Sequence, residues 1–525
     1  MAGVGALLLV AILQRGDDSV AAQIRARAQD NGGGALVSFY APRAYRAAWS
    51  GEHGPNRLAD DLVAAISRAD LEGLEPEDYH LSAIRSSLDS LRDDVAHGRA
   101  LTASRLATLD LALSDAFLLY ASHLLGGRVD PETLHPRWDA NRRDADLGTV
   151  LEDALQSRKI ARVLQRLVPT YDGYRRLREA LGRERAVVAA GGWPRLPVGP
   201  ALKRGDKGPP VATLRERLRT EDDLHEDVGD SSFDDKVERA VRRFQSRHGL
   251  ESTGVVDADT RAELNVGAAA RVEQLRINLE RWRWLPQDLG RRRIVVNIAA
   301  QELQVIEDGE VVLGMRVVVG REFKRTPVFS DTVRYIVLNP NWHVPPTIAV
   351  EELIPKIQRD PTYLERFGMH LYSAGPNAQE VDPSTVDWST VTVDSFPYRL
   401  TQDPGRLNAL GRIKFIFPNR YDIYLHDTPS RGLFDQAQRD FSHGCIRVEK
   451  PIDLAVYLMK KSRWNREAIE DTLDEGTERT IYLPRPTPIH LLYWTAWADE
   501  DGTIQFRPDI NDLDQTLAVA LTKKD

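Results

Sequence analysis

Apolar residues in the first part of the chain recur at helical spacing. One amphipathic stretch is marked by Leu62, Ile66, Leu71 and Leu74, and a second, strongly apolar one spans residues 109–125. Residues from about 20 to 195 are therefore predicted to be helical. The spacing alone indicates no catalytic or binding role for this region.

A Gly/Pro-rich linker, residues 190–200, separates the helical region from a compact unit at residues 201–266. Two helical faces are marked by Val211, Leu214 and Leu218, and then by Val237, Ala240, Val241 and Phe244. Asp257 is placed to cap a third helix. The pattern predicts a small module of three short helices.

After a helix that ends near residue 286, the apolar pattern becomes typical of strands. Predicted strands cover residues 294–298, 303–306, 311–319, 335–338 and 421–425. Asp308-Gly309 predicts a hairpin turn between the second and third of them. Residues 346–406 form an insertion of mixed helical and loop character.

Length and charge limit the classes of protein. A chain of 525 residues suggests roughly three or four domains. The 42% hydrophobic and 28% charged residues fit a soluble globular protein, and a net charge of −8 argues against a nucleic-acid partner.

The N-terminus carries an apolar run at residues 2–13, which is too short to span a bilayer but suits an export signal. Ser19-Val20-Ala21 offers small residues for cleavage. No basic segment precedes the run, and Arg15, Asp17 and Asp18 follow it. We expect a signal or anchor-like segment at residues 1–22, with a buried N-terminal helix as the alternative.

The only cysteine, Cys445, lies in the run Ser442-His443-Gly444-Cys445-Ile446-Arg447. A lone thiol is either inert, part of an intermolecular disulfide, or a nucleophile. His426 lies upstream, with 15 residues between it and Ser442. A histidine that removes the thiol proton makes a cysteine an effective nucleophile.

This histidine, spacing and run resemble the active-site signature of the L,D-transpeptidases, which cross-link or trim bacterial peptidoglycan through an acyl-cysteine. Other segments resemble the large periplasmic Gram-negative members, with a YkuD-like catalytic domain: residues 39–40, 73–79, 127–131, 339–345 and 488–496. The resemblance implies a multidomain α+β fold, with a helical scaffold, a three-helix peptidoglycan-binding domain and a β-rich catalytic domain with a lid insertion.

The expected domains follow from these segments. They are a scaffold at 23–195, a peptidoglycan-binding domain at 201–266, a linker helix at 267–290, a catalytic domain at 291–485 with its lid at 346–406, and a C-terminal segment at 486–525 that packs on the scaffold.

As the family pattern implies, Cys445 is the nucleophile and His426 its base. The N–H groups of Gly444 and Cys445 are candidate donors to the oxyanion, with the Tyr424 hydroxyl as a third. Tyr424 shares a strand face with His426 by the two-residue period, and packing in the strand is its alternative role. His443 is expected to shape the loop.

Four further residues are candidates for substrate binding. Arg447 either holds a substrate carboxylate or braces the loop, and Trp342 either walls the groove or belongs to the core. Ser442 is expected to bond the backbone locally. The Asp427 carbonyl is a candidate to orient His426, and its carboxylate is either a third catalytic member or solvated.

The resemblance implies 3-3 cross-linking by acyl transfer from a tetrapeptide stem, with release of D-alanine, to an amine acceptor. It implies an exported, periplasmic protein, anchored at the inner membrane or free, whose partners are peptidoglycan stems and other wall-synthesis proteins. No cofactor and no metal is expected.

Several alternatives remain open. One is a non-catalytic wall-binding scaffold, and others are an L,D-carboxypeptidase or an enzyme that attaches wall proteins. A zinc site of His343, His426, His443 and Cys445 matches no common spacing. A papain-like protease would have its cysteine before its histidine, the reverse of the order here.

Overall fold

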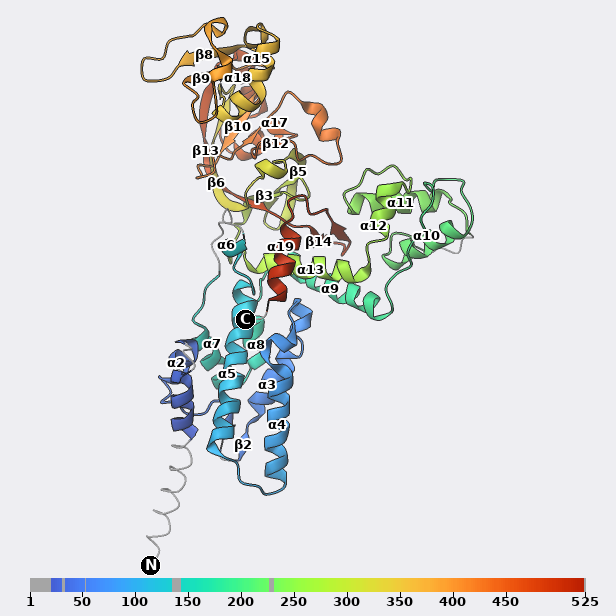
Figure 1. Cartoon of the computed structure of the whole chain (residues 1–525), viewed down its shortest axis with the longest axis vertical. Coiled ribbons are helices and arrows are strands. Elements are labelled where there is room, and N and C mark those ends of the chain that lie inside the picture. Colours follow the sequence, from blue (N-terminus) through green and yellow to red (C-terminus); the bar gives the residue numbers. More distant parts are fainter. Residues whose placement is uncertain (1–19, 31–33, 52, 135–142, 226–230, 524–525) are drawn as a thin grey trace, which may run out of the picture. The chain divides into compact units, whose positions relative to one another are not determined.

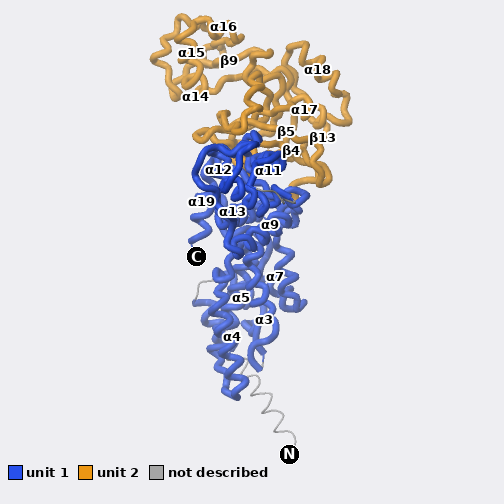
Figure 2. The backbone as a smooth tube through the Cα atoms, turned by 90° about the vertical axis from the view of Figure 1, so that its right-hand side faces the viewer, with its two compact units in different colours: residues 1–136, 140–287, 495–525 blue, residues 137–139, 288–494 orange. Residues whose placement is uncertain are grey.

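The computed structural model describes residues 20–30, 34–51, 53–134, 143–225 and 231–523. The chain divides into two compact units (Figure 2). The first comprises residues 1–136, 140–287 and 495–525, and the second comprises residues 137–139 and 288–494. Most of the expected signal or anchor, residues 1–19, lies outside the described residues. Among the described helices, none has the length and apolar character needed to cross a membrane.

The N-terminal part of the first unit is helical, as predicted (Figure 1). Its helices are α2 (Gly34–Tyr40), α3 (Arg57–Ile66), α4 (Leu81–Ala96), α5 (Ala103–Gly126), α6 (Pro131–Leu134), α7 (Leu147–Ser157), α8 (Ile160–Gln165) and α9 (Asp172–Ala189), with short 3-10 turns at Ala69–Glu72 and Pro76–Tyr79 and a small hairpin of β1 (Ser50–Gly51) and β2 (Gly54–Pro55). Helix α5 forms because residues 109–125 are rich in Leu and Ala, which favour helices, and Thr102 caps its first turn.

The buried Asp110 of α5 fixes this helical region from within. Its carboxylate accepts the backbone N–H groups of Ala48 and Trp49 at 2.9 Å, and the Tyr40 hydroxyl donates to it at 2.6 Å. A buried carboxylate is tolerated only when its acceptors are satisfied, as they are here. These bonds tie the segment after α2 to α5.

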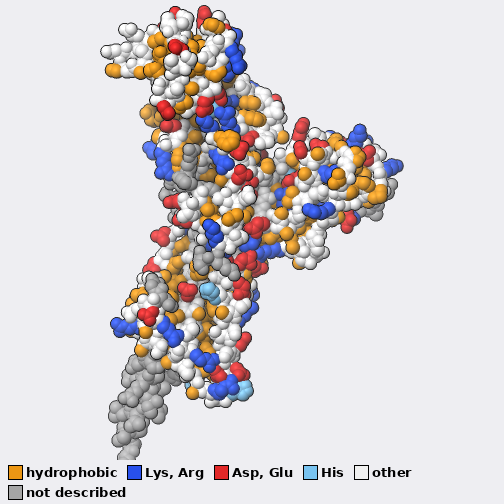
Figure 3. All heavy atoms as spheres, viewed as in Figure 1, with side chains coloured by type: hydrophobic (Ala, Val, Ile, Leu, Met, Phe, Trp, Pro, Cys, Tyr) orange, Lys and Arg blue, Asp and Glu red, His pale blue; other side chains and the backbone are white. Residues whose placement is uncertain are grey.

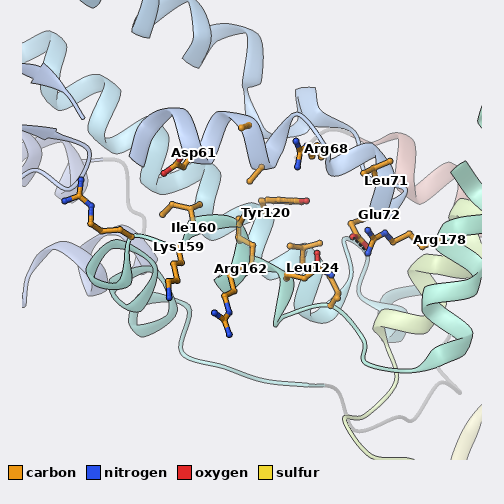
Figure 4. A pocket seen from close by; sticks show the side chains of 17 residues that line it. Asp61, Arg68, Leu71, Glu72, Tyr120, Leu124, Lys159, Ile160, Arg162 and Arg178 are labelled. Carbon is orange, nitrogen blue, oxygen red and sulfur yellow. Dashed lines mark ion pairs between the residues drawn. The ribbon is translucent and has the colours of Figure 1, made fainter. Parts of the chain in front are cut away.

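A pocket of about 510 Å³ lies among the helices of this region (Figure 4). Glu72 and Arg178 form an ion pair at its edge, with 3.2 Å between Oε1 and Nη1. The Tyr174 hydroxyl donates to the other carboxylate oxygen at 2.8 Å. Neither Cys445 nor His426 lines this pocket, so it is separate from the candidate site below.

Residues 201–266 form three short helices, as predicted: α10 (Pro209–Thr220), α11 (Asp235–Arg247) and α12 (Ala258–Leu264). The Asp257 side chain accepts the N–H of Thr260 at 2.8 Å, which confirms the predicted cap. All seven apolar residues named above as the faces of the first two helices are fully buried in one cluster with Phe233 and Leu264. The module therefore has a hydrophobic core of its own.

The rest of the first unit lies after that module in sequence, partly before and partly after the second unit. It comprises α13 (Ala268–Arg283), β14 (Ala496–Ala498), β15 (Ile504–Phe506) and α19 (Leu513–Thr522). Asp514 of α19 is paired with Arg281 of α13 at 2.5 Å. The C-terminal segment is thereby joined to the helix that precedes the barrel in sequence.

The second unit is built on a closed barrel with the strand order β10-β11-β12-β5-β4-β3-β13-β6. The strands are β3 (Arg292–Asn297), β4 (Glu302–Glu307), β5 (Glu310–Val318), β6 (Phe329–Leu338), β10 (Ile413–Ile416), β11 (Leu425–His426), β12 (Ile446–Val448) and β13 (Arg479–Leu492). Helices α17 (Pro451–Leu458) and α18 (Arg466–Glu475) follow β12 in sequence. The α+β fold class is confirmed.

The hairpin predicted at Asp308-Gly309 joins β4 to β5, and both residues have positive φ, +54° and +96°. Barrel closure depends on β13, which pairs with β6 on one side and in parallel with β3 on the other. Residues 489–492 of β13 pair with β3, so this strand continues past residue 485, where the sequence analysis places the end of the catalytic domain.

The insertion at residues 346–406 has structure and a core of its own. It contains α14 (Pro346–Ile348), a π-helical turn (Ala349–Leu353), α15 (Ile354–Arg359), α16 (Tyr363–Arg366), β8 (Met369–Ser373) and β9 (Tyr398–Gln402). With β7 (Trp342–His343), the two strands form a sheet of order β7-β9-β8. Its buried cluster includes Leu353, Ile357 and Leu371, together with Trp342.

On the face shown in Figure 3, acidic and basic side chains of the described residues are interspersed. Neither sign of charge dominates that face. This matches the mixed composition of the chain, 70 basic and 78 acidic residues.

Candidate active site

Three neighbouring barrel strands carry the row of residues at the centre of the candidate site. Lys414 of β10 stands opposite His426 of β11, and His426 stands opposite Arg447 of β12. Residues paired across adjacent strands project to the same face of a sheet, with strands about 4.8 Å apart. Lys414, His426 and Arg447 therefore form one row across the barrel wall.

The loop before β12 carries Cys445 and turns at Gly444, whose φ is +116°. A Cβ there would be strained and would lie 3.3 Å from Ile423 Cδ1. Ser442 Oγ accepts the Gly444 N–H at 3.0 Å and donates to the Cys445 carbonyl at 2.6 Å. Thr326 Oγ1 donates to the Gly444 carbonyl at 2.8 Å. These bonds fix the loop.

The Cys445 thiol is partly exposed and has a perturbed pKa. Burial raises the pKa of the thiol, whereas its hydrogen bonds with Tyr424 and the charge of Lys414 lower it, and the net direction is upward. Burial, followed by the neighbouring Cys445 sulfur, raises the pKa of Tyr424 well above its usual value. The thiol is therefore protonated at rest and needs a base.

His426 is buried, with 5% of its surface exposed, and its Nδ1 lies 2.5 Å from the Asp427 carbonyl oxygen. A carbonyl only accepts, so Nδ1 carries the proton and Nε2 is the unprotonated nitrogen of the neutral ring. Burial, together with the charges of Arg447 and Lys414, lowers the pKa of His426 to about 3. The imidazole is thus neutral at rest.

The predicted strand at residues 421–425 is wrong in its extent, because β11 contains only Leu425 and His426. Asn419 Oδ1 accepts the N–H groups of Tyr421 and Ile423 at 3.0 and 3.2 Å. These side-chain bonds replace a strand ladder with a turn. Tyr424 still reaches the site, and its ring centre is 5.7 Å from that of His426.

A cavity of about 750 Å³ opens over Cys445 and His426. Tyr424, Trp342 and Arg447 also line it. Residues from the insertion complete the wall: Thr347, Ile348, Glu352, Leu353, Lys356, Tyr363, Phe367, Met369 and Gln402. The volume lies within the range of ligand sites in proteins, about 300–1,000 Å³. The insertion thereby supplies one side of a substrate-sized cavity.

His443 points to the insertion. Its Nε2 lies 2.8 Å from Glu352 Oε1 and 3.1 Å from Arg321 Nη2. Burial lowers the pKa of His443, whereas Glu352 raises it, and the net direction is downward. The ring links the Cys445 loop to the π-helical turn of the insertion.

The geometry limits what Ser442 and Asp427 can do. The Ser442 hydroxyl is 2% exposed and both of its bonds stay within the loop, so it is not open to a substrate. The Asp427 carboxylate accepts the Arg412 N–H at 2.9 Å and pairs with Arg431 at 3.1 Å. It lines a different cavity from Cys445, which disfavours both a direct catalytic role and contact with the substrate.

The expected N–H donor of Gly444 is also occupied, because it donates to Ser442 Oγ. The Cys445 N–H has no acceptor among the described residues. Trp342 combines its two expected roles, since it is 8% exposed in the core of the insertion and also lines the cavity.

Sequence reasoning missed three residues here. Lys414 completes the row with His426, Thr326 holds the Cys445 loop, and Glu352 binds His443. Lys414 could have been found from the sequence, because it lies in the short apolar strand that pairs with the His426 strand. Glu352 could not, since its approach depends on how the insertion folds.

The zinc alternative finds no support in the described part of the chain. There, no group of three His, Cys, Asp or Glu residues is arranged to hold a metal ion. His443 instead binds Glu352, and His426 binds a carbonyl.

Family models match three parts of the chain. Residues 291–477 match "L,D-transpeptidase catalytic domain", residues 207–264 match "Putative peptidoglycan binding domain", and residues 34–181 match "Scaffold domain". The three matches fall on the barrel with its insertion, the three-helix module and the N-terminal helices.

Two curated relatives match parts of the chain. The "Putative L,D-transpeptidase" of Haemophilus influenzae is 38% identical over 249 residues, which are 47% of this chain and 49% of the relative. "Epoxide hydrolase 1" of Sus scrofa is 30% identical over 108 residues, 19% of this chain and 23% of that protein. The chain thus spans about half or less of the relatives it matches.

Among solved structures, the L,D-transpeptidase of Xylanimonas cellulosilytica (its residues 123–326) is 18% identical. The match covers 56% of this chain and 98% of that one, with a TM-score of 0.18. The family assignment rests on the sequence matches. The chain is a multidomain protein in which a YkuD-type L,D-transpeptidase catalytic domain is joined to a scaffold domain and a peptidoglycan-binding domain.

Proposed function

We propose that this chain is a peptidoglycan L,D-transpeptidase that forms 3-3 cross-links by acyl transfer through Cys445. The observation that carries the proposal is the cavity into which Cys445 and the neutral His426 both open. A lone partly exposed thiol beside a buried, carbonyl-oriented imidazole is the arrangement of a nucleophile and its base.

In the proposed first step, the His426 Nε2 takes the thiol proton while the sulfur attacks the carbonyl of the stem's D-centre residue. The C–N bond to the terminal D-alanine breaks, and its amine leaves with the proton from His426. The product is a thioester at Cys445. An amine of a second stem then attacks the thioester, gives its proton to His426 and restores the thiol.

The tetrahedral oxygen carries a negative charge in both steps. We assign its stabilisation to the N–H of Cys445 and the hydroxyl of Tyr424, since the Gly444 N–H is already bonded. Such a donor is commonly worth about 3 kcal/mol in the transition state. Gly444 then serves catalysis by its backbone conformation.

Arg447 is the proposed holder of a donor carboxylate. Its Nε is buried with no hydrogen-bond partner among the residues that the structure describes, and Arg447 lines the cavity that contains Cys445. A guanidinium binds a carboxylate with two parallel hydrogen bonds, which suits a stem peptide rich in carboxyl groups. Trp342 and the insertion at residues 346–406 would form the lid over the donor.

The other domains would place this chemistry at the wall. We propose that residues 201–266 hold peptidoglycan and that residues 23–195 act as a scaffold. The protein would then work outside the cytoplasm, in the periplasm, with residues 1–22 as its export signal or anchor.

The direct test uses the Cys445→Ala and Cys445→Ser chains with purified disaccharide tetrapeptides. Mass spectrometry follows D-alanine release and the 3-3 dimer. The unchanged chain should form both products, whereas both variants should lose turnover and keep the fold by circular dichroism. Turnover by Cys445→Ala would refute the mechanism.

The alternatives give different products in the same assay. Release of D-alanine without dimer would indicate an L,D-carboxypeptidase, and transfer to a protein lysine would indicate a wall-protein attachment enzyme. A non-catalytic scaffold would give no product and no carbapenem adduct at Cys445.

A further inference from the structure

Lys414 is a partly buried lysine on the wall of the Cys445 cavity. Its ammonium lies 3.9 Å from the centre of the Tyr424 ring, and no carboxylate of the described residues forms an ion pair with it. Burial lowers the pKa of this lysine. Removing an ammonium from water without a paired carboxylate is costly, so such groups are frequent at functional sites.

The strand register places this charge beside the reacting groups. Lys414 flanks His426 on one side, as Arg447 does on the other, and Lys414 lines the same cavity as Cys445. The two cations face a site whose reaction creates negative charge on sulfur and then on oxygen.

The carboxylates near this row of residues do not form ion pairs that would neutralise the charge of Lys414. Glu352 is bound to His443, and Glu478 accepts two hydrogen bonds from Asn341, at 2.6 and 3.1 Å. Asp422 raises the pKa of Cys445, which opposes the effect of Lys414. The Asp427 carboxylate faces another cavity, and the Tyr424 hydroxyl is neutral.

We propose that Lys414 is a further functional residue of this site, a fixed positive charge that keeps His426 neutral and favours the anionic sulfur and oxygen formed during acyl transfer. It moves no proton, since the proton passes from Cys445 Sγ to His426 Nε2. The inference rests on the proposed function for its chemistry, but the electrostatic effect is measurable without any transfer reaction.

The test is the pH dependence of Cys445 alkylation by iodoacetamide in the full chain. The thiolate displaces iodide, and each adduct reports on Cys445 alone because the chain has one cysteine. Removing the charge in Lys414→Met should raise the pKa of the thiol. We expect the rate profile to move to higher pH by on the order of one unit, which is about a tenfold lower rate near pH 7.

Two matched variants separate charge from structure. Lys414→Arg keeps the charge and should keep the profile of the unchanged chain. Lys356→Met removes a lysine that lines the same cavity from the insertion and should not shift the profile. Lys414→Gln provides a second neutral variant if Lys414→Met does not fold.

A profile that is the same in Lys414→Met or Lys414→Gln as in the unchanged chain would overturn the proposal. So would a shift of equal size in Lys414→Arg or Lys356→Met, because the effect would then not come from the charge at this position. Failure of the chain to form 3-3 dimers would reject the proposed function and leave the alkylation result standing.

Discussion

At the scale of single residues, the two histidines near Cys445 have different partners. His426 donates from Nδ1 to the Asp427 carbonyl, whereas His443 is bound through Nε2 to Glu352. A base needs a free ring nitrogen directed at the thiol. We therefore propose that His426 is the proton acceptor and that His443 positions the loop.

We expect His426→Ala to slow acylation of Cys445 by a carbapenem far more than His443→Ala does. General-base assistance is typically worth about 100- to 10,000-fold, whereas the loss of His443 removes one link to the insertion. Acylation rates by mass spectrometry across pH decide between them, with both variants first checked for folding. Equal losses, or a larger loss for His443→Ala, would reverse the assignment.

The low pKa of His426 also affects stability. Its pKa is about 3 in the folded chain and near 6.5 when unfolded. Below pH 6.5 the unfolded chain binds the proton and the folded chain does not, so stability falls as pH decreases towards 3. Between pH 7 and pH 5, this one residue should lower the free energy of unfolding by about 2 kcal/mol.

The measurement is the free energy of unfolding of the barrel in urea, monitored by hydrogen exchange at pH 7 and at pH 5. The His426→Gln chain should lose less stability over this interval than the unchanged chain. The buried His490, whose pKa burial also lowers, remains in both chains, so the difference isolates His426. The same acid dependence in both chains would contradict the low pKa.

At the scale of elements, the sequence predicts what repeats locally. The helices of the N-terminal region, the three-helix module and the β4–β5 hairpin follow from apolar spacing and turn residues. The extent of the strand before His426 does not follow from this spacing. The Asn419 side chain accepts backbone N–H groups there that a strand ladder would otherwise use. Cys445 and His426 follow from the run around the cysteine and its resemblance to the L,D-transpeptidase signature, whereas Lys414 and Glu352 depend on strand register and on the folded insertion.

Deletion of the insertion, residues 346–406, should impair use of a long peptide donor, because the insertion lines the cavity over Cys445. Acylation by a small carbapenem should remain, since Cys445, His426 and the oxyanion donors lie outside the deleted residues. The measurement is the rate of D-alanine release set against the rate of carbapenem acylation.

The deletion also uncovers Trp342, so a milder variant is needed. Tyr363→Ala removes one lining side chain of α16 and should raise KM for the tetrapeptide donor with little change in carbapenem acylation. An unchanged donor KM in a folded Tyr363→Ala chain would argue that this wall does not contact the donor.

At the scale of the whole molecule, the chain combines a reactive domain with a module that lines no part of the Cys445 cavity. The residues of the three-helix module bury an apolar cluster of their own. Because the module has its own core, the proposed wall binding and the proposed acyl transfer should be separable.

Removal of residues 201–266 should therefore weaken retention on insoluble peptidoglycan and leave carbapenem acylation of Cys445 nearly unchanged. The assay pairs pelleting with acylation on the same preparation, so a normal acylation rate shows that the barrel of the shortened chain is folded. The Cys445→Ala chain is the converse control, because it should pellet fully and form no adduct. If the shortened chain pellets as well as the full chain, residues 201–266 are not the wall-binding part. Retention would then have to come from the helical region or from the catalytic cavity itself.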